Sequence, residues 1–218
     1  MYNRNTVSDV RNEFHRLYNE EIFVTDKSGV KMLEICNASF IADEPSIFGK
    51  VNEDYVQREL EWYYSQSLCV NDIPGGAPAI WASVADNDGM INSNYGWCIF
   101  SKDNYNQYDH VLNELKDFSE SRRAVMIYTR PNMWYDYNHN SRSDFMCTNA
   151  VQYLVRNGRL ETIVQMRSND VVFGYKNDFA WQNHVRNKLA NDLSVEPGNI
   201  HWNVGSLHVY ERHFQLVK

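Results

Sequence analysis

The sequence predicts an α+β fold in a single domain over residues 1–218. Apolar residues recur at three- and four-residue spacing in several segments, which indicates amphipathic helices. Between these segments lie short runs typical of strands, and two of the runs are joined by the hairpin dipeptide Asn157-Gly158. Helices combined with antiparallel hairpins are typical of α+β proteins. The 218 residues, 43% of them hydrophobic, are enough for one substantial core, and no repeat or linker divides the chain.

Four segments have the apolar spacing of a helix. The first follows Thr6, a residue type that caps helix N-termini. The others are expected over residues 53–66, 104–117 and 179–193. The apolar positions that define the four helices are Val7, Val10, Phe14 and Leu17; Val56, Leu60 and Tyr63, with Tyr55, Glu59 and Trp62 beside them; Tyr105, Tyr108, Leu112 and Leu115; and Trp181, Val185 and Leu189.

Strands are expected at residues 124–128, 148–156 and 159–167. Near the end of the chain, His208-x-Tyr210 has the spacing that places two side chains on one face of a strand. These two residues could therefore act together on one ligand, although the pair alone is weak support for a site.

The hairpin register relates distant residues. A two-residue loop pairs Arg156 with Arg159, and counting back sets Cys147 opposite Ser168 and next to Arg167. A bulge would shift this register by one residue, so the pattern predicts neighbourhood rather than contact.

Composition excludes several classes of function. The formal net charge of −7 argues against a general nucleic-acid or anionic-membrane binder. No apolar run approaches the length of a membrane span. The cysteines contain no Cys-x-x-Cys pair, which favours a reducing cytoplasm and argues against a disulfide framework or a zinc site. They are Cys36, Cys69, Cys98 and Cys147.

Cys147 is a candidate nucleophile. A nearby cation lowers the pKa of a thiol, and Arg167 could supply that charge. A thiolate suits conjugate addition to an electron-poor ring carbon. The alternative is a small buried hydrophobic residue. Two adjacent arginines, Arg122 and Arg123, could together bind an oxyanion such as a phosphate or a carboxylate. The alternative is that they are solvated residues at the edge between a loop and a strand.

Two carboxylates have comparable alternatives. Glu59 lies beside the apolar face of its helix, where partial burial would raise its pKa and suit it to general acid–base work. It could also be an ordinary exposed helix charge. Asp178 precedes the fourth expected helix, and from the residues alone an N-cap is its simplest interpretation.

In order and spacing, these groups resemble the thymidylate synthase superfamily over residue 22 to the end. Within it, the chain is more similar to the deoxycytidylate hydroxymethylase branch known from T-even-type bacteriophages. The segments that carry the resemblance are Asp26-Lys27-Ser28-Gly29, Arg58-Glu59-Leu60-Glu61-Trp62, Ile80-Trp81, Asn94-Tyr95-Gly96, Ser121-Arg122-Arg123, Phe145-Met146-Cys147, Arg167-Ser168-Asn169-Asp170, Phe173-Gly174 and His208-Val209-Tyr210.

Three positions depart from the usual synthase pattern. Synthases generally have Asn at the position of Asp178, Pro-Cys-His in place of Met146-Cys147-Thr148, and a second Trp in place of Val84. An Asn amide can donate to uracil O4 and accept from N3–H, and cytosine reverses that edge. A protonated carboxyl group can accept from N4 and donate to N3, so Asp178 fits cytosine.

The resemblance implies a mixed, mostly antiparallel sheet flanked by helices, with sheets packing in a homodimer. It implies transfer of a one-carbon unit from 5,10-methylenetetrahydrofolate to C5 of dCMP, water addition to give 5-hydroxymethyl-dCMP, and no metal. The implied catalytic residues are Cys147 (the nucleophile), Glu59 (water and proton transfers) and Asp178 (the base edge). If the chain is phage-encoded, the implied compartment is the host cytoplasm.

The resemblance also assigns binding roles by position. The phosphate would contact Lys27, Arg167 and Ser168, together with Arg122 and Arg123 from the partner subunit. The base would contact Asn169 and the backbone of Asp170, and the sugar would contact His208 and Tyr210. Tyr95 would line the pocket near Cys147, and Trp81 and Asp170 would border the folate.

Alternatives remain at this point. The same fold could methylate dCMP, or act on dUMP as a hydroxymethylase or a thymidylate synthase. A non-catalytic nucleotide- or RNA-binding protein belongs to a different class, and the set Glu59, Cys147 and Asp178 argues against it.

Overall fold

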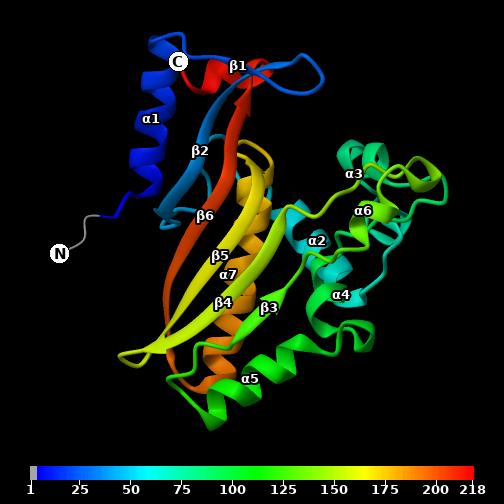
Figure 1. Cartoon of the computed structure of the whole chain (residues 1–218), viewed down its shortest axis with the longest axis vertical. Coiled ribbons are helices and arrows are strands. Elements are labelled where there is room, and N and C mark those ends of the chain that lie inside the picture. Colours follow the sequence, from blue (N-terminus) through cyan, green and yellow to red (C-terminus); the bar gives the residue numbers. More distant parts are fainter. Residues whose placement is uncertain (1–3) are drawn as a thin grey trace. The chain divides into compact units, whose positions relative to one another are not determined.

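The computed structural model describes residues 4–218 (Figure 1). The chain forms two compact units. One takes the chain up to Val51 and then Tyr153–Lys218, and the other is Asn52–Gln152. The expectation of a single domain over the whole chain stays a prediction.

The strands form a six-stranded sheet in the order β1-β2-β6-β5-β4-β3. Strands β5 and β6 are parallel, whereas the pairs β1–β2, β2–β6 and β3–β4 are antiparallel. The expected α+β class, with a mixed and mostly antiparallel sheet, is therefore confirmed. The strands are β1 (Val24–Thr25), β2 (Lys31–Ile41), β3 (Val125–Ile127), β4 (Thr148–Arg156), β5 (Arg159–Asp170) and β6 (Glu196–Tyr210).

The turn between β4 and β5 has the expected local geometry. Asn157 and Gly158 both have positive φ, 53° and 74°. A type I′ turn requires this at both central residues, so the predicted hairpin turn is confirmed. Strand β5 continues three residues beyond the predicted end at 167, to Asp170.

The first unit contains helices α1 (Val7–Asn19) and α7 (Gly174–Leu193). Helix α1 begins as predicted, because Thr6 and Asp9 form a reciprocal capping box. Helix α7 packs against β5 and β6, where the orange ribbon of Figure 1 follows the strands. It begins at Gly174 rather than at residue 179, so the N-cap interpretation of Asp178 is wrong and this carboxylate lies inside the helix.

The second unit is mainly helical. Its helices are α2 (Glu53–Ser65), α3 (Ala79–Val84), α4 (Tyr95–Phe100), α5 (Gln107–Asp117) and α6 (Met133–Asp136). Short 3-10 turns in the two units cover Val70–Asp72, Lys102–Asn104, His139–Ser141 and Glu211–Leu216. Helices α2 and α4 approach so closely that a Cβ added to Gly96 would lie 1.8 Å from the carbonyl oxygen of Tyr63. Only glycine fits at this crossing.

Helix α5 starts later than its apolar spacing predicts. Tyr105 and Asn106 have φ of 60° and 46°, which is left-handed backbone and interrupts the helix. Tyr105 is 81% exposed, so its predicted place on the buried face is wrong. The buried positions of α5 are Tyr108, Val111 and Leu115. Among the helices of residues 4–218, none combines the length and apolarity needed to cross a bilayer.

Candidate active site

Glu59 is the centre of a buried polar cluster in the second unit. Its side chain is 4% exposed, on the α2 face that also buries Tyr55, Trp62 and Tyr63. The Tyr55 hydroxyl donates to Glu59 Oε1 at 2.6 Å. The indole N–H of Trp81 donates to the Tyr55 hydroxyl oxygen at 2.8 Å and to Glu59 Oε1 at 3.3 Å. Helix α3 thus brings Trp81 against a carboxylate borne by α2.

Burial raises the pKa of Glu59 to about 7, although hydrogen bonds from Tyr55, Trp81 and Tyr63 act in the opposite direction. A carboxyl group with this pKa can hold a proton and release it near neutral pH. The sequence-based expectation placed Glu59 next to the apolar face, and the structure places it within the buried face.

Cys147 is partly buried at the end of a firmly anchored segment. The anchor is Asp144, which is 6% exposed and accepts from the Asn92 backbone N–H at 2.6 Å and the Ser93 hydroxyl at 2.7 Å. Burial raises the pKa of Asp144 against these hydrogen bonds. On the other side of the thiol, Thr148 is fully buried. The polypeptide is therefore held on both sides of Cys147.

Tyr95 lies beside this segment, as the resemblance implied. Its hydroxyl accepts from Thr148 Oγ1 at 3.0 Å. Both side chains are buried, at 5% and 0% exposure. Since Thr148 directly follows Cys147, helix α4 sets a phenol next to the thiol-bearing residue.

Asp178 takes part in an ordered hydrogen-bond chain in the first unit. Trp202 Nε1 donates to Asn169 Oδ1 at 3.3 Å, and Asn169 Nδ2 donates to Asp178 Oδ2 at 2.7 Å. An indole N–H can only donate, so it fixes which end of the Asn169 amide faces each partner. Asp178 Oδ2 is thereby engaged as an acceptor, which fixes the orientation of this carboxyl group relative to Asn169.

Further candidate binding residues lie on β5 and β6, near these hydrogen-bonded side chains. Asp170 Oδ1 accepts from the backbone N–H groups of Val172 at 2.7 Å and Phe173 at 2.8 Å, which shapes the turn into α7. Ser168 is half-buried and Arg167 is exposed. In the parallel pairing, Ser168 lies beside Ser206 and Asp170 beside His208. His208 is 7% exposed, and its ring packs edge-on against Tyr210 at 5.0 Å.

Lys27 is exposed in the turn between β1 and β2. Asp26 Oδ1 orders that turn by accepting from the backbone N–H groups of Ser28 at 2.8 Å and Val30 at 3.0 Å. The Val30 hydrogen bond is the main cause of a lowered Asp26 pKa, to which the charge of His208 also contributes. The turn that carries Lys27 thus lies close to the His208 ring.

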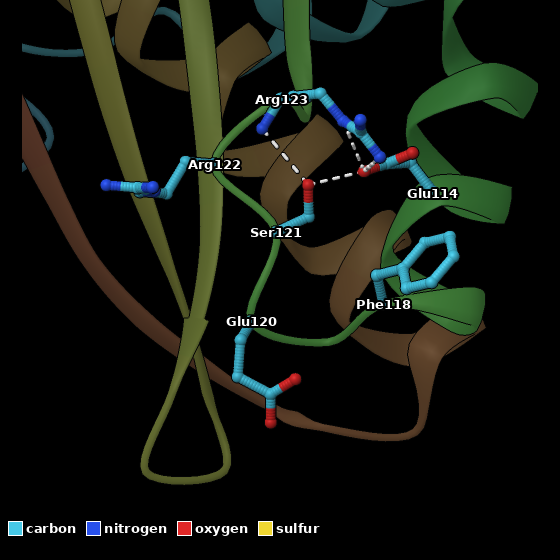
Figure 2. Close-up of a pocket in the computed structure, with 6 residues that line it drawn as sticks. All are labelled: Glu114, Phe118, Glu120, Ser121, Arg122 and Arg123. Atoms are coloured by element: carbon cyan, nitrogen blue, oxygen red, sulfur yellow. Dashed lines mark hydrogen bonds and ion pairs between the residues drawn. The ribbon is translucent and has the colours of Figure 1, made fainter.

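The two adjacent arginines diverge instead of forming one clamp. Figure 2 shows Arg122 extending away from Glu114 while Arg123 turns toward it. The Arg123 guanidinium lies 2.9 Å from Glu114 Oε1, and the Ser121 hydroxyl donates to the same oxygen. These residues line an open pocket of about 340 Å³ together with Phe118 and Glu120. Both arginines are exposed, and Arg122 forms no ion pair within residues 4–218.

Other expectations concern pairs that join the two units. Cys147 belongs to the unit Asn52–Gln152, and Arg167 and Ser168 belong to the other. Their expected proximity stays a prediction. Within residues 4–218, no three His, Cys, Asp or Glu side chains group as metal ligands would.

The thymidylate synthase family model matches residues 48–218. The chain belongs to the thymidylate synthase family. It is also 57% identical to the deoxycytidylate 5-hydroxymethyltransferases of Enterobacteria phages T4 and T2, over 97% of this chain and 89% of theirs.

More distant members share the architecture. A thymidylate synthase of Bacillus subtilis subsp. natto is 29% identical over 74% of this chain and 58% of its own length. The solved structure of thermostable thymidylate synthase A from Bacillus subtilis matches with a TM-score of 0.69 and 22% identity. That match covers 94% of this chain and 81% of the synthase. The thymidylate synthase fold inferred from the sequence is therefore confirmed.

Two supporting groups of this thymidylate synthase family member were missed by sequence reasoning. Tyr55 is the hydrogen-bond partner of Glu59, and its i,i+4 spacing from Glu59 was a usable signal. Trp202 orients Asn169 from β6, and no local pattern marks that relation, because the two residues lie on different strands and 33 positions apart in the sequence.

Replacing Gly174 with alanine tests whether the Asn169 amide matters in this family member. A Cβ at residue 174 would lie 3.0 Å from Asn169 Nδ2 and 3.7 Å from Asp178 Oδ2. We expect the added methyl group to displace the amide and weaken dCMP binding by about tenfold, the effect of losing one hydrogen bond. Isothermal titration calorimetry measures this. Ala180→Gly, an exchange of the same two residue types within the same helix, is the control. Unchanged dCMP affinity in Gly174→Ala would contradict the expected role of the Asn169 amide.

Replacing Glu59 with glutamine should remove a pH-dependent loss of stability. The pKa of Glu59 is raised from 4.5 to about 7 in the folded chain, so the folded state binds this proton more tightly than the unfolded state does. Its contribution to stability is complete below pH 4.5 and is lost as pH rises toward 7, a change of about 3 kcal/mol. Urea unfolding of both proteins across this range measures the difference.

The matched control is Glu61→Gln, because Glu61 is an exposed carboxylate on the same helix. It should leave the pH dependence as it is in the wild-type protein. If the free energy of unfolding depended on pH in the same way in wild type and in Glu59→Gln, the assignment of a raised pKa to Glu59 would be contradicted.

Proposed function

We propose that this protein is a deoxycytidylate 5-hydroxymethyltransferase. It transfers a one-carbon unit to C5 of dCMP and completes the product, 5-hydroxymethyl-dCMP, with water. The observation that carries the proposal is the 57% identity over 97% of the chain to phage proteins of that name. The ordered carboxylate of Asp178 supports the choice of cytosine, and the buried acid Glu59 supports the proton transfers that the reaction needs.

Cys147 is the proposed nucleophile. Its thiolate adds to C6 of the cytosine ring, which moves electron density to C5 and makes that carbon nucleophilic. C5 then bonds to the methylene carbon of the co-substrate, and loss of the C5 proton with release of tetrahydrofolate leaves an exocyclic methylene group on C5. Water adds to this methylene group, and expulsion of the thiolate from C6 re-forms the C5–C6 double bond. The anchoring of residues 144 and 148 supports this role, because a fixed backbone limits the positions open to the sulfur.

Asp178 is the proposed reader of the base. Its Oδ2, which accepts from Asn169, carries a proton that is donated to cytosine N3, while Oδ1 accepts from the N4 amino group. That proton also stabilises the ring when addition at C6 removes its aromaticity. Because Trp202 fixes the Asn169 amide, the carboxyl group cannot reverse the two oxygens without losing a hydrogen bond.

The co-substrate 5,10-methylenetetrahydrofolate supplies the one-carbon unit in this proposal. Glu59 fits its neighbourhood, because an acid with a pKa of about 7 can protonate a departing amine and then accept a proton from water. Trp81 holds this acid through its indole N–H and offers a half-buried aromatic face for the folate. Asp170 borders the same ligand. Cys147 requires a reducing compartment, which is the cytoplasm of the host if a phage encodes the chain.

The phosphate and sugar contacts complete the substrate site. Lys27, Arg167 and Ser168 bind the phosphate, and His208 and Tyr210 bind the sugar hydroxyl. We further propose a homodimer in which Arg122 and Arg123 reach the phosphate of the partner's site. Their exposure and the outward course of Arg122 support this arrangement (Figure 2). Mixing inactive Arg122→Ala and Cys147→Ala subunits should then restore part of the activity.

Product mass tests the reaction. Incubation with dCMP and methylenetetrahydrofolate should increase the nucleotide mass by one hydroxymethyl substitution. A plain methyl product would overturn the water step, and exclusive turnover of dUMP would overturn the assignment of Asp178. Absence of tritium release from C5 of dCMP, despite binding, would indicate a non-catalytic nucleotide-binding protein.

A further inference from the structure

A chain of polar groups leads from strand β2 to His208. Glu34 of β2 is paired directly with His208 of β6, and Ser206 precedes His208 by two residues on the same strand face. The Ser206 hydroxyl donates to Glu34 Oε1. Its oxygen lies 3.4 Å from His208 Nδ1, and the backbone carbonyl oxygen of Ser206 lies at the same distance.

The number of hydrogens available to these polar groups determines which ring nitrogen of His208 is protonated. A carboxylate can only accept, so the single hydroxyl hydrogen of Ser206 is used by Glu34. The Ser206 hydroxyl oxygen then faces Nδ1 with a lone pair, as does the carbonyl oxygen. A nitrogen between two acceptors carries a hydrogen, and a neutral imidazole has only one. The lone pair of the ring therefore resides on Nε2.

We propose that Glu34 and Ser206 are positioning residues that hold His208 as its Nδ1–H tautomer. His208 Nε2 is then an obligatory acceptor, and it recognises a ligand group that donates a hydrogen bond. This inference rests on the proposed function, in which His208 meets the sugar of a nucleoside monophosphate. The specificity that follows is for a 3′-hydroxyl with its hydrogen, and it disfavours a 3′-deoxy sugar or a 3′-ether.

The surroundings of His208 agree with a fixed ring. It is 7% exposed and packs against Tyr210, which follows on the same strand face. Asp26 lies within electrostatic range from the β1–β2 turn. Glu34 also accepts from the exposed thiol of Cys36 at 3.6 Å through its other oxygen, which leaves Oε1 to Ser206.

Nuclear magnetic resonance tests the tautomer directly. Long-range proton–nitrogen spectra of protein labelled with ¹⁵N-histidine distinguish Nδ1–H from Nε2–H, and His208→Asn assigns the signals. At pH 8.5, above the range in which histidine ordinarily titrates, wild type should show Nδ1–H. Glu34→Leu frees the serine hydrogen and should populate Nε2–H, whereas Glu34→Gln retains an acceptor oxygen and should restore the wild-type pattern. An Nε2–H pattern in wild type would overturn the proposal.

Ser39→Ala is the matched structural control. Ser39 Oγ donates to Asn203 Oδ1 at 2.9 Å, so this variant also removes a hydroxyl bond between β2 and β6, without contacting His208. It should leave the His208 spectrum unchanged. The same change in Ser39→Ala as in Glu34→Leu would reduce the effect to general loosening of the two strands and overturn the specific role of Glu34.

Ligand discrimination is the second readout. Wild type should bind dCMP about tenfold more tightly than 2′,3′-dideoxycytidine monophosphate, the effect of one hydrogen bond. Glu34→Leu should reduce this ratio toward one, and Ser39→Ala should preserve it. If wild type turned over dCMP normally and Glu34→Leu kept the wild-type ratio of the two affinities, this inference would be overturned and the proposed function would stand. Failure of wild type to bind dCMP would overturn the proposed function, while the tautomer result would still be decided by the spectra.

Discussion

Replacing Asp178 with asparagine is expected to transfer the base preference from dCMP to dUMP. In the variant, the hydrogen bond from Asn169 would hold the oxygen of the new amide, because Trp202 prevents the Asn169 amide from turning over. That oxygen can also accept from uracil N3–H, and the new NH2 group can donate to O4. On the cytosine edge the same amide would set its oxygen against the N3 lone pair and its NH2 group against the N4 donor.

We expect the ratio of kcat/KM for dCMP over dUMP to fall by roughly 10³-fold, as a site with unpaired buried polar groups rejects the wrong edge. Tritium release from C5 of each nucleotide measures the ratio. Asp192→Asn removes the same charge from the far end of α7, where Asp192 pairs with Lys188 at 2.9 Å, and serves as the control. Full dCMP selectivity in Asp178→Asn would rule out our assignment of this residue.

Replacing Cys147 with serine should abolish turnover while nucleotide binding persists. A serine hydroxyl is hardly ionised at neutral pH and has no neighbouring base assigned to it, so addition at C6 should be slower by on the order of 10⁴-fold or more. The change removes no charged ligand of the nucleotide, so the Kd for dCMP should stay within a few-fold of the wild-type value.

Rapid-quench measurement of C5 tritium release, with calorimetry for binding, separates the two effects. Cys36→Ser provides the same chemical change at an exposed site on β2 and should retain full activity. Substantial tritium release from Cys147→Ser would show that the covalent step belongs to another group.

Local chemistry explains which elements could be predicted from the sequence. Asn157-Gly158 specifies its turn through two positive φ angles, and Thr6 with Asp9 specifies the start of α1, so both were predicted correctly. Helix α7 begins with Gly174 and has no side-chain cap, which explains why its start was missed. The interruption at Tyr105 was missed as well, because left-handed backbone at a tyrosine leaves no trace in apolar spacing.

Contacts between residues on different strands could not be predicted from local sequence patterns. The full strands β2 and β6 were not predicted. The β2–β6 register pairs Glu34 with His208, and the β5–β6 register aligns Asp170 with His208. The neighbours of Glu59 on α2 left burial and exposure as alternatives, and the structure buries the side chain. Its contact with Trp81 was not, because α3 approaches α2 only in the folded unit.

Gly96 and Glu59 should differ in conservation once selection for catalysis is lost. An alanine at residue 96 would meet the Tyr63 carbonyl at 1.8 Å in every folded descendant, active or not. Glu59 costs stability at neutral pH, so neutral replacements there favour folding. In a lineage that has abandoned the reaction, residue 59 should drift early and Gly96 should persist, which gives a way to recognise inactive descendants from sequence alone.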